Sequence, residues 1–162
     1  MDPATSAADA ARGGTSGGVA ISLPIRWGDM DALGHVNNII YFQYCESARI
    51  AYFERMGYER FRPTPRHGPG MVTASLNFRR QLHYPGTVTV RARVTRIGGK
   101  SFTLHYDVID ESDGQVVADG ESVCVWVDYA QGRAEPLPRM LVDAIVEIEG
   151  DPGLRPAEPP ST

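Results

Sequence analysis

The feature that most constrains the fold is a helix predicted for residues 38–56 that is apolar on almost every side. At 100° per residue, Gln43, Ser47 and Glu54 fall within an arc of roughly 40°. The rest of the circumference is mainly apolar: Ile39, Tyr41, Phe42, Tyr44, Cys45, Ala48, Tyr52, Phe53 and Met56. Such a helix is expected to be surrounded by other elements rather than to lie on a surface. Gly57 is a suitable stop signal.

Strand patterns occupy most of the remaining chain. We expect strands over residues 20–27, 71–83, 87–97, 101–110 and 115–129. Turn residues at 84–86, 98–99 and 112–114 predict antiparallel hairpins between the last four. Residues 58–70 are expected to be an irregular loop, because they contain three prolines and two glycines. Residues 138–148 show helical spacing of apolar side chains, which predicts a short second helix.

These elements indicate one α+β domain, in which an antiparallel sheet of about five strands curls around the long helix. A plain two-layer α+β sandwich fits the same order of elements. We expect the domain to span residues 20–150 of the 162-residue chain. Residues 1–19 are rich in Gly, Ser and Ala and are predicted to be a disordered leader. Residues 151–162 are predicted to be a disordered proline-rich tail.

Composition excludes several classes of function. The formal net charge is −4 and no Lys/Arg-rich run is present, so no nucleic-acid partner is expected. No apolar stretch reaches the length of a membrane span, and the first residues lack an apolar signal core, so we expect a cytoplasmic protein without a membrane partner. Cys45 and Cys124 lie in apolar patterns, which favours buried free thiols over a disulfide.

No metal site is expected from spacing, because the chain has no Cys/His cluster of the kind that binds zinc. His67, His83 and His105 have no partner pattern and are interpreted as structural.

The segment before the long helix carries the groups suited to chemistry. Within residues 26–38, Asp31 and His35 precede a helix start where backbone N–H groups lack partners. Such donors stabilise developing negative charge, and a carboxylate and an imidazole can handle protons beside them. The set suits attack on a carbonyl carbon. The alternative is a capped helix with Asp31 as a cap carboxylate, and Asn37 or Asn38 is a suitable cap in either case.

The run from Arg26 to Gly57 resembles the opening of the hotdog-fold acyl-CoA thioesterases of the 4-hydroxybenzoyl-CoA thioesterase group. The resemblance rests on Asp-x-Asp-x-x-Gly, then His-Val-Asn-Asn, then Tyr-x-x-Tyr-x-Glu-x-Ala-Arg. Further matches are Tyr84-Pro85-Gly86 and the run Gly98 to Phe102, so the likeness covers about residues 22–130. It implies a hotdog fold that assembles as a homodimer or homotetramer, with sites formed between subunits.

The resemblance also implies catalytic roles. Asp31 matches the catalytic carboxylate, as nucleophile or as general base, and the backbone N–H near Asn38 matches the donor that polarises the thioester carbonyl. His35 matches the histidine of the His-Val-Asn-Asn branch, either as a catalytic or as an oriented structural group. Glu46 matches an acid that orients the machinery, although an ion pair with Arg49 three residues later is an alternative.

Binding positions follow from the same resemblance. Lys100 and Ser101 match positions that contact the CoA arm, and the acyl chain is expected beside Phe42, Cys45, Phe78 and the 58–70 loop. The expected reaction is hydrolysis of an acyl-CoA, or another acyl thioester, to free acid and CoA. No cofactor is expected, because CoA is part of the substrate. The alternatives are a hydratase or dehydratase on the same fold, a non-catalytic acyl-CoA binding module, and a domain without ligand.

Overall fold

The computed structural model describes residues 17–156. Most of the expected leader and the second half of the expected tail lie outside the described residues. Three short 3₁₀ turns, Trp27–Asp29, Tyr58–Phe61 and Pro152–Leu154, accompany the main elements. These elements are β1 (Val19–Ile25), α1 (Asn38–Met56), β2 (His67–Phe78), β3 (Gly86–Ile97), β4 (Ser101–Asp110), β5 (Gln115–Asp128), β6 (Arg133–Ala134) and α2 (Arg139–Glu149).

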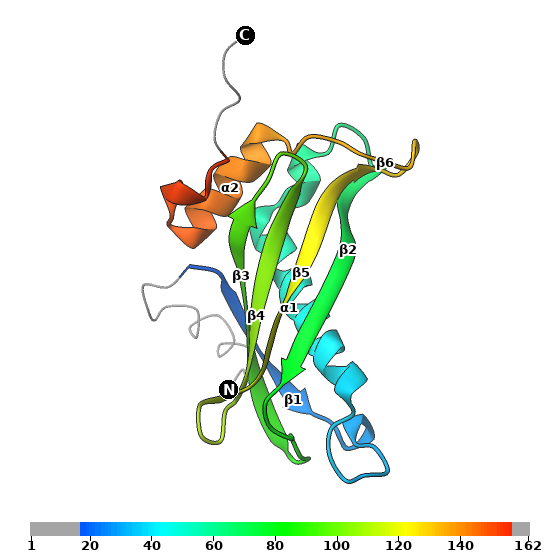
Figure 1. Ribbon diagram of the computed structural model, residues 1–162, viewed down its shortest axis with the longest axis vertical. Helices are drawn as coiled ribbons and strands as arrows, with labels where there is room; N and C mark the ends of the chain where they lie inside the picture. Colours follow the sequence, from blue (N-terminus) through cyan, green and yellow to red (C-terminus); the bar gives the residue numbers. More distant parts are fainter. Residues whose placement is uncertain (1–16, 157–162) are drawn as a thin grey trace, which may run out of the picture.

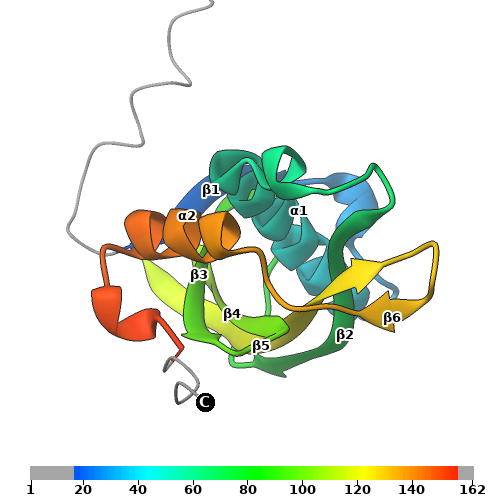
Figure 2. The same cartoon turned by 90° about the horizontal axis from the view of Figure 1, so that it is seen from above.

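The strands form one antiparallel sheet in the order β1-β3-β4-β5-β2, with the short β6 paired to β5. Figure 1 shows α1 running lengthwise behind the sheet, and Figure 2 shows the sheet curling around one side of that helix. This is the hotdog architecture that the resemblance implied, and the flat two-layer alternative is excluded. No helix within residues 17–156 is long and apolar enough to cross a membrane.

Two of the three predicted hairpins are confirmed, and one is wrong. β3 pairs with β4 and β4 with β5 through the turns at 98–100 and 111–114. β2, however, pairs with β5 instead of β3, so residues 79–85 form a crossing connection. Leu82 in this connection is only 1% exposed, and its carbonyl accepts a hydrogen bond from the Val36 N–H at 2.8 Å. The turn residues at 84–86 specify only that the chain reverses. Burial of Leu82 against the start of α1 favours a connection that crosses to β3 without pairing β2 with β3.

The predicted loop at residues 58–70 is also partly wrong. Tyr58–Phe61 form a 3₁₀ turn and β2 begins at His67, so Pro69 lies within a strand opposite Trp126. β2 lies at the edge of the sheet, where a proline without an N–H can be accommodated. Gly70 permits a close approach, because a Cβ there would lie 2.9 Å from the Tyr129 hydroxyl.

The helix α1 has the predicted bounds and clear end signals. The Asn37 side chain accepts a hydrogen bond from the Ile39 N–H at 3.0 Å, and Gly57 ends the helix with φ of +66°. The buried face comprises Tyr41, Tyr44, Cys45, Ala48, Tyr52, Phe53 and Met56. The helix is not surrounded within one chain, because the sheet covers one side and leaves Ile39 61% and Ile50 46% exposed.

The second helix packs at the opposite end of the sheet from the loop that precedes α1 (Figure 1). It buries Leu141, Val142, Ile145 and Val146. Oε1 of Glu149 accepts hydrogen bonds from the Tyr52 hydroxyl at 2.6 Å and from the Val94 N–H at 2.7 Å. One carboxylate therefore joins α2 to both α1 and β3.

Candidate functional site

The loop from Arg26 to Asn37 is built around one buried carboxylate. Asp29 is 2% exposed and accepts hydrogen bonds from the Arg26 N–H at 2.9 Å, from Arg26 Nε at 3.0 Å and from the Tyr44 hydroxyl at 3.0 Å. Its own carbonyl accepts from the Asn37 N–H at 2.9 Å. Asp29 therefore fixes both ends of the loop against α1. This gives the first acid of the Asp-x-Asp pair a structural role.

Electrostatics support this anchoring role. Burial by itself raises the pKa of Asp29, but the hydrogen bonds from Arg26 and Tyr44 together hold the pKa below its ordinary value. The same arrangement, with burial as the larger cause, raises the pKa of Tyr44 far above its usual range. The pair is thus an ionised carboxylate and a neutral phenol, as a stable anchor requires.

Asp31 lies on the tight part of the loop, partly sheltered from solvent. Its Oδ1 accepts a hydrogen bond from the Leu33 N–H at 2.8 Å, and its side chain is 23% exposed. The backbone closes around it, because the Asp31 N–H donates to the His35 carbonyl at 2.9 Å and Gly34 turns with φ of +85°. One carboxylate oxygen is held by the loop, and the other, Oδ2, is directed toward His35.

His35 lies beside this second oxygen. Its Nδ1 is 3.8 Å from Asp31 Oδ2 and 3.2 Å from the Val36 carbonyl oxygen. A carbonyl only accepts hydrogen bonds, so Nδ1 carries the hydrogen in this contact and Nε2 remains able to exchange a proton. His35 also lines a pocket of about 290 Å³ together with Asn38, Tyr41 and Phe78.

Asn38 is the first residue of α1. Within the part of the chain that the structure describes, its amide N–H donates to no protein acceptor. The next amide, that of Ile39, is already used by the Asn37 cap. The Asn38 N–H is therefore the available donor at the positive end of the helix dipole, on the same pocket as His35.

Glu46 is not brought to Asp31 within one chain. It is exposed and lies eight residues into α1, which is roughly 12 Å along the axis from Asn38. Glu46 lines two other depressions, one shared with Phe42 and Arg49 and one shared with Arg26. The alternative ion pair with Arg49 is absent among the described residues. Arg49 instead turns inward toward Tyr106. Burial raises the pKa of Tyr106, and the nearby Arg49 guanidinium partly offsets this rise.

The two aromatic residues expected beside the acyl chain line different pockets. Phe78 lines the His35 pocket and packs edge-on against Tyr41 at 5.2 Å. Phe42 and Cys45 line a neighbouring pocket of about 180 Å³ between α1 and strands β2, β4 and β5. The 58–70 segment follows the far end of α1, roughly 28 Å from its start. Within one chain this segment lines neither the Phe78 pocket nor the Phe42 pocket, and its place beside the acyl chain stays a prediction.

The turn between β3 and β4, at the end of which Lys100 and Ser101 lie, is at the opposite end of the sheet from the loop before α1 (Figure 1). The Asp31 loop follows Ile25, which pairs with Gly86 at the start of β3, whereas Lys100 follows the end of β3. The 12 residues of β3 separate them by roughly 36 Å. The Lys100 ammonium instead donates to the Ala134 carbonyl at 3.2 Å.

Sequence reasoning missed the far wall of the His35 pocket. Residues 79–81, in the crossing connection after β2, line it together with Tyr41. Arg80 is held there by Asp110 at 3.0 Å and by Asp113. No local pattern could have indicated this wall, because it forms only when the connection crosses the start of α1.

The fold and this loop together define a thioesterase-type hotdog domain. Residues 25–145 match the sequence profile of the Thioesterase-like superfamily. The match covers well over half of the chain, and this protein therefore belongs to that superfamily.

Individual relatives agree with this placement. The long-chain acyl-CoA thioesterase FadM of Escherichia coli strain K12 is 27% identical over 126 residues, which cover 78% of this chain and 96% of FadM. The PA2801 protein of Pseudomonas aeruginosa is 34% identical, with a TM-score of 0.70 over 78% of this chain and 96% of that one. Slr0204 of Synechocystis, a 1,4-dihydroxy-2-naphthoyl-CoA thioesterase, is 18% identical with a TM-score of 0.71 over 80% and 96% of the two chains, which is a likeness of fold.

Proposed function

We propose that this protein hydrolyses acyl-CoA thioesters at the loop that carries Asp31. The observation that carries the proposal is that the Asp31 carboxylate lies 3.8 Å from His35 on one loop, while His35 and the residue with the free helix amide, Asn38, line one pocket. Membership of the Thioesterase-like superfamily and the similarity to FadM support this class of reaction.

The chemistry requires attack on the thioester carbonyl carbon. In the first route Asp31 Oδ2 takes a proton from a water molecule, whose oxygen bonds to that carbon. In the second route Oδ2 bonds to the carbon directly, the carbon–sulfur bond breaks, and water later cleaves the acyl–aspartate anhydride. Both routes release CoA as the thiol and the acyl group as a carboxylic acid, and both place negative charge on the former carbonyl oxygen.

The Asn38 amide is the group that would hold this oxyanion. It lies at the first turn of a 19-residue helix, where N–H groups point out of the helix and the dipole favours negative charge. In other enzymes the loss of one such donor costs about 3–4 kcal/mol of transition-state stabilisation. Nε2 of His35, which carries no hydrogen in this tautomer, would accept the proton that the attacking water gives up and pass it to the departing CoA sulfur.

A complete site would require a second copy of the chain. Lys100 and Ser101 are too far from Asp31 in one chain to contact the same CoA molecule, since roughly 36 Å separates them. β2 is an edge strand, and Met71 and Val72 on it are 51% and 57% exposed, as is part of the apolar face of α1. A homodimer, or a homotetramer built from dimers, would cover these surfaces and bring the partner's CoA-contacting residues to Asp31.

The direct test is Asp31→Asn assayed on a panel of acyl-CoAs from acetyl through aromatic to long-chain. Free CoA is followed with a thiol reagent. We expect kcat to fall by on the order of 10²–10⁴-fold with a small change in KM, because the isosteric amide cannot act as base or nucleophile. Asp143→Asn, at a 47% exposed carboxylate on α2, is the matched control and should retain activity. Near-wild-type turnover by Asp31→Asn would reject the role of Asp31.

A second measurement separates the two routes. A single turnover in H₂¹⁸O with excess enzyme places ¹⁸O in the product acid if Asp31 activates water. If Asp31 is the nucleophile, ¹⁸O enters the Asp31 carboxylate over repeated turnovers, and mass spectrometry of the peptide detects it.

A further inference from the structure

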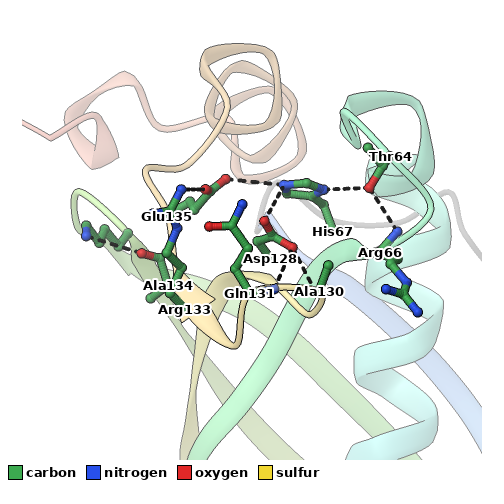
Figure 3. A network of polar contacts seen from close by, with 10 residues as sticks. Thr64, Arg66, His67, Asp128, Ala130, Gln131, Arg133, Ala134 and Glu135 are labelled. Carbon is green, nitrogen blue, oxygen red and sulfur yellow. Dashed lines mark hydrogen bonds and ion pairs between the residues drawn. The ribbon is translucent and has the colours of Figure 1, made fainter.

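Three polar side chains from distant parts of the chain meet at the end of the sheet away from Asp31. His67 begins β2, Asp128 ends β5 and Glu135 directly follows β6. Figure 3 shows all three directed toward one point between the strand ends. Neither their spacing in the sequence nor the proposed hydrolysis accounts for this cluster, which we call the 67/128/135 cluster.

The distances in the cluster suit a shared ion. His67 Nε2 lies 3.3 Å from Glu135 Oε2 and 3.9 Å from Asp128 Oδ2. The three donor atoms all lie within 4.8 Å of one another. A tetrahedral zinc ion with bonds of about 2.0–2.2 Å holds its ligand atoms roughly 3.3–3.5 Å apart, so small side-chain rotations would complete the arrangement.

A hydrogen bond at Nδ1 orients the imidazole ring of His67, so that Nε2 faces the two carboxylates. His67 Nδ1 lies 2.9 Å from Thr64 Oγ1, and Thr64 also accepts a hydrogen bond from the Arg66 N–H at 3.2 Å. The turn is closed by the His67 N–H, which donates to the Thr64 carbonyl at 3.1 Å. A hydrogen bond at the remote nitrogen that fixes the ring is the usual support of a metal-binding histidine.

One oxygen of Asp128 is held by the loop, and the other is open to a ligand. Its side chain is 7% exposed, and Oδ1 accepts hydrogen bonds from the Ala130 N–H at 2.8 Å and the Gln131 N–H at 3.3 Å. Oδ2 points at His67 Nε2 from a distance beyond hydrogen bonding and has no donor among the described residues. This oxygen is therefore available to a cation in the cluster.

The neighbouring Arg and Lys side chains do not neutralise the two carboxylates of the cluster. Arg133 contacts Glu135 through the other carboxylate oxygen, Oε1, at 3.2 Å and is 62% exposed. Lys100 donates to the Ala134 carbonyl rather than to a carboxylate. Two carboxylates and one imidazole therefore face each other with one exposed guanidinium on the rim.

We propose that His67, Asp128 and Glu135 bind one divalent transition-metal ion, with Zn²⁺ as the best fit. Imidazole nitrogen with two carboxylates is a zinc-type donor set, whereas Ca²⁺ and Mg²⁺ prefer oxygen ligands alone. Water fills the position that the three side chains leave, on the side where Glu135 is 26% exposed. The ion joins the starts and ends of β2, β5 and β6, and it stabilises this end of the domain without taking part in the hydrolysis at Asp31.

The test uses the full chain without a histidine tag, stripped of metal by chelator and desalted. Zn²⁺, Mn²⁺, Ca²⁺ and Mg²⁺ are titrated by calorimetry at pH 7.5, and bound metal is counted by mass spectrometry after a second desalting. We expect one Zn²⁺ per chain and a higher Tm with Zn²⁺, with little response to Ca²⁺ or Mg²⁺. His67→Gln and Glu135→Gln should each weaken Zn²⁺ binding by at least tenfold.

His105→Gln is the matched control. His105 also lies between two carboxylates, but it faces Asp107 with Nε2 and Glu121 with Nδ1, so the two acids cannot share one ion with a single ring nitrogen. Its Zn²⁺ binding should equal that of the wild type. If His67→Gln does not fold, Glu135→Gln at the rim decides alone. A wild type that retains no stoichiometric Zn²⁺, or binding that survives Glu135→Gln, overturns the proposal and leaves His67 as a structural group beside the two acids.

Discussion

The Tyr44 hydroxyl donates a hydrogen bond of 3.0 Å to Oδ2 of Asp29, a contact that joins the buried face of α1 to the loop that carries Asp31. Both side chains are at most 5% exposed. The contact therefore does two things: it satisfies a buried charge, and it holds the loop that carries Asp31 against the first turns of α1.

Tyr44→Phe should lower the free energy of unfolding by about 1–3 kcal/mol, because it leaves a buried carboxylate short of one donor. Denaturant unfolding at pH 7 measures this change. Tyr129→Phe removes a hydroxyl that donates to the Pro69 carbonyl at 3.2 Å on a 57% exposed side chain, and it should cost about 0.5 kcal/mol or less. Equal losses for both variants would contradict the anchoring role of Tyr44.

The low pKa of Asp29 predicts a loss of stability in acid. Its hydrogen bonds hold the folded-state pKa below the unfolded-state value of about 3.9. The stability that this carboxylate contributes is present above pH 4 and is lost as pH falls through the folded-state pKa. In Tyr44→Phe this loss should begin at higher pH, and unfolding curves from pH 5 to pH 2 would detect the shift.

Glu149 predicts the opposite sign. Burial raises its pKa despite the hydrogen bonds from Tyr52 and Val94. Its contribution is fully present below the unfolded-state pKa of about 4.3 and is lost as pH rises through the higher folded-state pKa. Glu149→Gln keeps an acceptor but cannot ionise, so its stability relative to the wild type should improve from pH 4 to pH 8. A constant difference over that range would show that Glu149 does not titrate with folding.

Both cysteines should be unreactive in the folded protein. Burial raises the pKa of Cys45 to about 12 and that of Cys124 to about 11. The thiolate is the form that attacks a thiol reagent, so at pH 7.5 neither cysteine of the native chain should react and both cysteines of the unfolded chain should react. A thiol-reagent titration with and without guanidinium measures this, and rapid reaction of the native protein would contradict the burial of these side chains.

Gly120 permits a close backbone approach that no other residue allows. A Cβ there would lie 2.0 Å from the Ser75 carbonyl oxygen of the paired strand β2. Gly120→Ala should therefore destabilise the fold by more than about 2 kcal/mol, within the range for overpacking. Gly28→Ala is the matched control, because nothing lies within 4 Å of its Cβ position. Similar thermal stability of both variants would argue against the strand pairing at this point.

The shared-site proposal predicts complementation between two variants. Lys100→Ala should raise KM for acyl-CoA, and Asp31→Asn should abolish turnover. A mixed dimer contains one site with Asp31 from one chain and Lys100 from the other, so refolding the two variants together should restore activity at the wild-type KM. If the mixture is only as active as the two variants measured separately and added, Asp31 and Lys100 do not act in a shared site.

Much of the fold was predictable because its determinants are local. The bounds of α1 follow from an apolar run between Asn37 and Gly57, and both residues cap the helix as their chemistry predicts. The β3–β4 and β4–β5 hairpins follow from Gly-rich turns. The candidate site was predictable for the same reason, since Asp31, His35 and Asn38 lie within eight residues of one another.

Tertiary structure alone decided the rest. The sequence determined which segments become strands, but the pairing of β2 with β5 instead of β3 depends on where Leu82 can be buried. Similarly, local patterns could not bring His67 to Asp128 and Glu135, because these residues are separated by more than 60 positions. Hydrogen bonding within a turn or helix is set by neighbours in the chain, whereas burial and long-range pairing are properties of the whole packed domain.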